Sequence, residues 1–177
     1  MKAQLTGAFG SAADATLKTI RTAINEGKNF SDINLGRKID RDDVDKWLKS
    51  EKYRSRLSHL LLMLTTETLY WEECHQDHLF PRSKFKETVY AELGLTDQEK
   101  QFYNMHTDSI ANLHLLNSSV NITKSDNDFV DWSADQNQAF LEASHIPMDI
   151  DLNFKNFPQF IERRKEKLTT LLLSKLQ

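Results

Sequence analysis

Three short polar clusters, residues 77–83, 108–113 and 121–126, contain the side chains best suited to chemistry. Asp77 directly precedes His78. Because successive side chains of an extended segment point to opposite sides, one of the pair can hold a metal ion while the other faces a substrate. A carboxylate joined by an asparagine oxygen is an incomplete, oxygen-rich site of the kind that Mg²⁺ accepts. A neutral histidine beside it can take a proton from water, and a second asparagine can fix the histidine tautomer.

The order and spacing of these clusters resemble the HNH, or His-Me finger, nuclease motif. The nine-residue step from Asn112 to Asn121 resembles the HNH domain of CRISPR RNA-guided nucleases. The helical surroundings and the strand-like segment 112–116 are more similar to the C-terminal nuclease domain of GmrSD-type modification-dependent restriction enzymes. One departure is the 34-residue separation between His78 and Asn112, which is longer than in many compact HNH motifs. The matching residues are Asp77-His78-x-x-Pro81-x-Ser83, Ser109-Ile110-x-Asn112 and Asn121-x-x-Lys124-Ser125-Asp126.

The resemblance implies a ββα-metal core and a role for each matched residue. A strand would end at His78, a second would start near Asn112, and a short helix would carry Asn121. His78 would be the general base, and Asn112 would orient the histidine and its loop. Asp77 and Asn121 would hold one Mg²⁺ or Mn²⁺ ion, which stabilises the transition state and the leaving oxygen. Lys124 would lie where a phosphate contact is plausible.

The implied function is that of a metal-dependent endonuclease that hydrolyses DNA phosphodiester bonds in restriction or anti-phage defence. Besides DNA, the resemblance to GmrSD-type enzymes implies an N-terminal nucleotide-using domain or a partner subunit, because this sequence itself contains no P-loop. The alternative is a non-catalytic helical interaction module that retains a degenerate nuclease fold. Divalent-ion binding separates the two hypotheses, because only the first needs it.

The net charge of the chain is -3, and this average argues mildly against a nucleic-acid binder. The charges are, however, unevenly distributed along the chain. Residues 57–153 contain 5 basic and 16 acidic side chains, whereas residues 1–56 and 154–177 each have a net charge of +4. An acidic middle would attract a cation and repel DNA until one is bound. Candidate phosphate contacts are therefore Arg82 and Lys124 near the motif and Arg163 and Arg164 in the basic C-terminal helix.

The surrounding elements are predicted to be mostly helical, because glycine (5) and proline (3) are scarce. Apolar spacing and capping residues predict helices over 13–27, 40–53, 55–71, 83–93, 96–105, 119–124 and 157–176, with a strand over 110–116. We therefore expect an α+β, mostly helical fold in which a ββα-metal core is embedded in a helical domain. Residues 1–71 would form a helical part, 72–130 the nuclease core, and 131–177 a helical part packed on the same domain.

The cysteine content and the length of the apolar runs indicate the cellular compartment. Cys74 is the single cysteine, so the chain forms no internal disulfide, and a reducing cytoplasm is the simplest setting. The longest apolar run, residues 60–64, is too short to span a bilayer, so no membrane contact is expected.

Overall fold

The computed structural model describes residues 39–66, 74–117, 121 and 124–176, with positions 22 and 25–27. Short helices surround one two-stranded antiparallel sheet, which confirms the expected α+β, mostly helical class. The elements are α3 (Arg41–Ser50), α4 (Arg56–Thr65), β1 (Cys74–His78), η2 (Arg82–Lys84), α5 (Glu87–Leu93), α6 (Asp97–His106), η3 (Ile110–Asn112), β2 (Leu113–Asn117), α8 (Phe129–Ala134), α9 (Gln138–Ala143), η4 (Phe154–Asn156) and α10 (Phe157–Leu176).

Capping residues explain where several helices begin and end. Asp40 and Thr96 each form a capping box at the start of α3 and α6, so two backbone donors are satisfied at each helix start. Ser55 accepts a hydrogen bond from the backbone N–H of Ser58 at the start of α4. Gly94 ends α5 in the left-handed region, with φ 67°. These starts and stops agree with the sequence-based predictions.

Other predicted elements were displaced or incomplete. The helix predicted over 83–93 begins at Glu87, because residues 82–84 form a 3-10 turn after Pro81. The strand predicted over 110–116 begins at Leu113, because residues 110–112 also form a 3-10 turn. Most of the helix 13–27 and residues 67–71 of the helix 55–71 lie outside the described residues. The two short helices α8 and α9 were not predicted.

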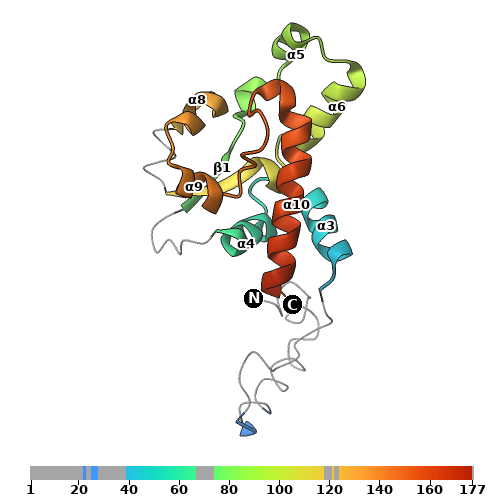
Figure 1. The fold of residues 1–177 in the computed structure, drawn as a ribbon. Helices are drawn as coiled ribbons and strands as arrows, with labels where there is room; N and C mark the ends of the chain where they lie inside the picture. Colours follow the sequence, from blue (N-terminus) through green and yellow to red (C-terminus); the bar gives the residue numbers. More distant parts are fainter. Residues whose placement is uncertain are drawn as a thin grey trace.

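The long helix α10 runs through the middle of the fold, between α3 and α4 (Figure 1). It contributes side chains to two hydrophobic clusters. Its first half gives Phe157 and Phe160 to an aromatic cluster around Phe80, with ring centroids 5.3 and 5.0 Å from Phe80. Its second half gives Leu168 and Leu172 to an aliphatic cluster shared with α3, α4 and β2. Segments from all three predicted parts of the chain, 1–71, 72–130 and 131–177, therefore contribute to one of the clusters.

The sheet sets the directions of the motif side chains. In the antiparallel register Asp77 pairs with His114 and His78 pairs with Leu113. Directly paired residues point to the same face, and neighbours along a strand point to opposite faces. Asp77 and His114 therefore share one face, and His78 lies on the other. Within the described part of the chain, no helix is long and apolar enough to cross a membrane.

Candidate active site

His78, the last residue of β1, is held by an acidic and an aromatic neighbour. Its side chain is buried, and its Nε2 lies 2.8 Å from Asp108 Oδ1. The Tyr53 ring lies 4.7 Å from the imidazole, centroid to centroid. Because a carboxylate accepts, Nε2 carries the proton, and Nδ1 is left with the lone pair. Burial lowers the pKa of His78, which outweighs the opposing effect of Asp108, so the imidazole is neutral at pH 7.

Asp108 is fixed by a second partner, Arg82. The guanidinium donates from Nε to Oδ1 at 2.9 Å and from Nη2 to Oδ2 at 2.6 Å. Although partial burial opposes ionisation, the hydrogen bonds from Arg82 and His78 hold the pKa of Asp108 below its usual range. Such a bidentate pair fixes the plane of the carboxylate. The carboxylate that orients His78 is therefore itself oriented.

Asn112 fixes the loop that follows His78. Its side chain has no exposed surface. Oδ1 accepts from the Phe80 N–H at 3.0 Å, and Nδ2 donates to the carbonyls of Phe80 at 3.2 Å and Thr107 at 2.8 Å. The expectation that Asn112 also orients the histidine needs a correction, because Asp108 makes the bond to the ring. The bonds of this side chain go to the backbone of Phe80 and Thr107, and none joins it to the imidazole.

Asp77 lies on the opposite face of the sheet with two partners on one oxygen. Its Oδ2 is 3.1 Å from His114 Nε2 and 2.9 Å from Lys124 Nζ. Burial raises the pKa of Asp77, but the bonds from His114 and Lys124 outweigh it, so the pKa is lowered overall. The carboxylate is therefore ionised at pH 7. Among the described residues nothing is hydrogen-bonded to its Oδ1.

Lys124 does not lie where a phosphate could reach it. Its side chain has no exposed surface, and Nζ also donates to the His78 carbonyl at 2.6 Å. The prediction of a nucleic-acid contact is therefore wrong for this residue. The ammonium instead joins position 124 to the end of β1.

Arg164 also needs reassignment. It is 2% exposed, and its Nη1 donates to the carbonyls of Ala111 at 2.8 Å and Leu113 at 2.7 Å. Burial lowers its pKa to about 9. The predicted phosphate contact is wrong here as well, because amphipathic α10 turns Arg164 inward and leaves Arg163 exposed. Arg163 and Arg82 remain accessible, with 60% and 55% of their side chains exposed.

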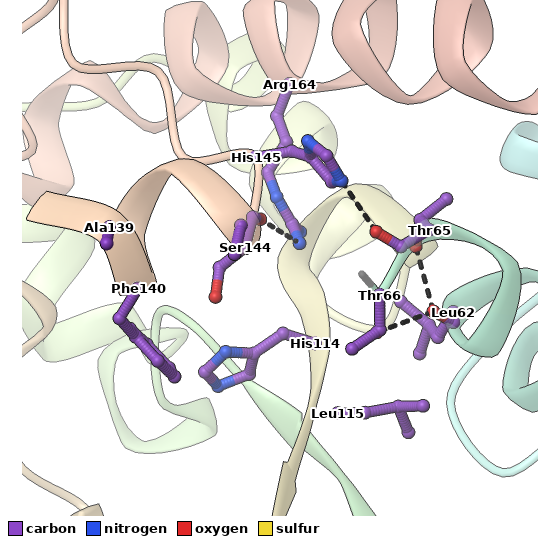
Figure 2. Close-up of a pocket in the computed structure, with 11 residues that line it drawn as sticks. Leu62, Thr65, Thr66, His114, Leu115, Ala139, Phe140, Ser144, His145 and Arg164 are labelled. Carbon is purple, nitrogen blue, oxygen red and sulfur yellow. Dashed lines mark hydrogen bonds between the residues drawn. The ribbon is translucent and has the colours of Figure 1, made fainter. Parts of the chain in front are cut away.

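A cavity of about 330 Å³ lies beside β2, away from His78. Figure 2 shows His114 projecting from β2 into it, between Phe140 and Thr66. His145 closes one side, with Nε2 2.6 Å from the Thr65 carbonyl. Arg164 closes the same side by donating from Nη2 to the Ser144 carbonyl at 3.2 Å. Among the described lining residues, His114 is the one that belongs to the Asp77 network.

Asn121 lies in another cavity, between β1 and the turn that joins α3 to α4. It is not hydrogen-bonded to Asp77 in this structure. No group of three or more His, Cys, Asp or Glu side chains suited to a metal ion occurs within the ranges that the structure describes. A carboxylate and an amide oxygen are ligands that Mg²⁺ accepts. Asp77 shares a face of the sheet with His114, however, whereas Asn121 lines the cavity beside the α3–α4 turn, so their pairing in one metal site stays a prediction.

Two residues of the site were missed by sequence reasoning. Asp108 belongs to the second polar cluster but had no assigned role, and its place in that cluster was its only signal in the sequence. Tyr53 is 25 positions from His78 and gave no signal at all. The hydrogen bond from the Tyr53 N–H to the Asp108 carbonyl, 2.9 Å long, connects the two residues only in the folded chain.

The fold and the site together define an α+β chain with an Asp-His pair at the end of a two-stranded antiparallel sheet and a buried asparagine beneath the following loop. No protein-family model matches the sequence, and no curated protein matches it. The resemblance to HNH nucleases therefore rests on the motif residues of the sequence alone.

Proposed function

We propose that the chain is a metal-dependent endonuclease of the HNH type that hydrolyses DNA phosphodiester bonds. The observation that supports it best is the state of His78, which is neutral, oriented by Asp108, and followed by a loop that Asn112 holds in place. A neutral, oriented imidazole is what general-base catalysis requires. The role in restriction of phage or modified DNA, and a cytoplasmic place of action, belong to the same proposal.

The chain's residues divide the work of hydrolysis. His78 takes a proton from the attacking water at Nδ1, and Asp108 stabilises the imidazolium that forms. Arg82 keeps Asp108 in plane and places a positive charge beside the reacting phosphate. Asp77 and Asn121 would hold one Mg²⁺ or Mn²⁺ ion, which when bound stabilises negative charge on the phosphate and on the leaving oxygen.

One contact favours the alternative, a non-catalytic interaction module. Lys124 already places a positive charge on Asp77 Oδ2, as expected of a site that has lost its metal. A divalent ion would then have to share the carboxylate with an ammonium group. Metal binding measured without any substrate therefore separates the two functions.

The test combines DNA cleavage with metal binding. Purified protein is incubated with supercoiled plasmid and Mg²⁺ or Mn²⁺, with EDTA as a control. We expect His78→Ala and Asp77→Asn to abolish cleavage, whereas Asp149→Asn, a change at an exposed carboxylate, leaves it intact. In thermal unfolding, Mn²⁺ should raise the Tm of the parent and of Asp149→Asn but not of Asp77→Asn.

Undiminished cleavage by His78→Ala would show that this residue is not the base. A parent protein that neither cuts DNA nor gains stability from Mn²⁺ would support the interaction module instead.

A further inference from the structure

A second feature of the molecule borders the His78 site. The turn between α3 and α4 and the exposed side of β1 enclose a cavity of about 560 Å³. This strand-side cavity, as we call it, has no carboxylate among the described residues that line it. Its main lining residues are Tyr53, Arg54, Arg56, His59, His75 and Asn121.

The strand-side cavity carries positive charge where the basic segment 1–56 meets the acidic segment that follows it. Arg54 and Arg56 are both exposed there, and His59 and His75 add two donors. The following segment, 57–153, holds 16 acidic side chains against 5 basic ones. Two exposed guanidinium groups with no carboxylate among the described lining residues attract an anion to this place.

The cavity is continuous with the His78 site through Tyr53. The Tyr53 ring lies against the imidazole of His78, and the guanidinium carbons of Arg54 and Arg82 lie 5.1 and 5.0 Å from its centroid. A polyanion bound along Arg54 and Arg82 would therefore pass His78. Asn121, one of the two proposed metal ligands, lines the same cavity.

The backbone holds Arg54 in a conformation that few residues adopt. Its φ is 69°, in the left-handed region, where a side chain is strained and glycine is not. Two hydrogen bonds hold this strained conformation in place. The Arg54 N–H donates to Gln76 Oε1 at 2.8 Å, and the Tyr53 N–H donates to the Asp108 carbonyl at 2.9 Å. Strained residues that their surroundings hold in place are concentrated at functional sites. The turn is therefore a fixed support that projects Arg54 beside β1.

We propose that the strand-side cavity binds the sugar-phosphate backbone of the DNA strand next to the phosphate that is cut. Arg54 and Arg56 contact its phosphates, and the strand continues past the Tyr53 ring to His78. This inference rests on the proposed nuclease function and deepens it. It places the DNA contact on the α3–α4 turn instead of on the basic helix α10.

The test measures binding of a short DNA duplex by fluorescence anisotropy over a range of salt concentrations. All variants carry His78→Ala, so that the duplex stays intact, and Mg²⁺ is held constant. We expect the Arg54→Gly, Arg56→Ala pair to weaken binding at least 10-fold. The slope of log affinity against log salt should become shallower by about 0.9 for each phosphate that the variant no longer neutralises.

Two controls separate a binding role from loss of charge or of folding. Lys175→Ala removes an exposed positive charge in the last turn of α10 and should leave affinity and slope unchanged. Arg54→Gly alone should unfold at the same Tm or a higher one, because glycine adopts the left-handed backbone without a Cβ clash. Weaker DNA binding in a protein that is at least as stable is the signature of a contact residue.

The outcomes distinguish this inference from the proposed function. If the parent cuts DNA but the paired variant keeps its affinity and salt slope, the cavity is not the binding site. An equal loss of DNA affinity in Lys175→Ala would also overturn this inference, because any positive surface charge would then contribute equally to binding. A parent that neither binds nor cuts DNA would overturn the nuclease proposal itself.

Discussion

Asp108 connects two side chains of the site, because the same carboxylate accepts from His78 and from Arg82. Replacing it by asparagine keeps the shape but removes the charge that stabilises a protonated imidazole. We expect Asp108→Asn to lower kcat for plasmid cleavage on the order of 10²-fold, with a small change in KM. The initial rates of the two proteins check this expectation.

The matched control for Asp108 is Asp126→Asn. Asp126 is exposed and accepts from the Ser83 hydroxyl at 2.7 Å. Equal rates for the two asparagine variants would show that Asp108 does not act on His78.

Asn112 is the buried residue on which the loop geometry depends. Asn112→Ala removes its three hydrogen bonds and leaves the Phe80 N–H buried without this partner. We expect the free energy of unfolding to fall by about 2–3 kcal/mol, measured by urea denaturation. Asn153→Ala, at an exposed amide, should cost far less. A similar loss in both variants would contradict the role given to Asn112.

At the residue scale, the sequence predicted identities better than directions. Asp77, His78 and Asn112 were selected by residue type and order. As expected, a strand ends at His78 and the second strand starts next to Asn112. Lys124 and Arg164 were misread, because a basic residue in a polar or amphipathic segment does not reveal whether it turns inward. Arg164 turns inward because backbone carbonyls of η3 and β2 accept from it.

At the element scale, helix starts and ends were predicted correctly where a residue acts directly on the backbone of its own helix. Gly94 predicts a helix end because its left-handed φ carries no Cβ penalty, and Thr96 predicts a helix start through its capping box. The start of β2 was misplaced by three residues. The 3-10 turn before it depends on Arg164, more than 50 positions away, which no local pattern can report.

Gly94 gives a test at this scale. Gly94→Ala should lower the free energy of unfolding by about 1 kcal/mol, because alanine is strained at a φ of 67°. Gly94→Asn should cost less, since asparagine tolerates this region better. Urea denaturation gives the free energy of unfolding of both variants. A larger loss for Gly94→Asn than for Gly94→Ala would contradict the strain argument.

At the scale of the whole molecule, two histidines make stability depend on pH. Burial lowers the pKa of both His106 and His114 to about 4, and Lys52 and Lys165 add to the effect at His106. Asp77 opposes it at His114. Between about pH 6.5 and 4 the unfolded chain therefore binds more protons than the folded one. The free energy of unfolding should fall as the pH is lowered through this range.

His106→Gln isolates one of these two groups. We expect the variant to lose less stability than the parent between pH 6.5 and 4.5, measured by urea denaturation at several pH values. An unchanged pH dependence would mean that His106 is protonated equally in both states.

The overall class and the order of the strands could be predicted from composition, periodicity and motif spacing. The site could be predicted only in part, because Tyr53 and Asp108 meet His78 through contacts between the α3–α4 turn and the loop after α6. The ββα-metal core stays a prediction, since most of the segment that carries Asn121 lies outside the described residues.

The path of α10 limits how the motif could be moved into another protein. Ile110, Leu113 and Leu115 flank the motif's middle asparagine, and they pack in the same cluster as Leu168 and Leu172 of α10. A fragment of residues 72–130 would expose these side chains and release the carbonyls that Arg164 holds. We expect such a fragment to show no cooperative unfolding by circular dichroism, whereas residues 39–177 should unfold in one transition. The motif is thus transferable only together with the last helix of the chain.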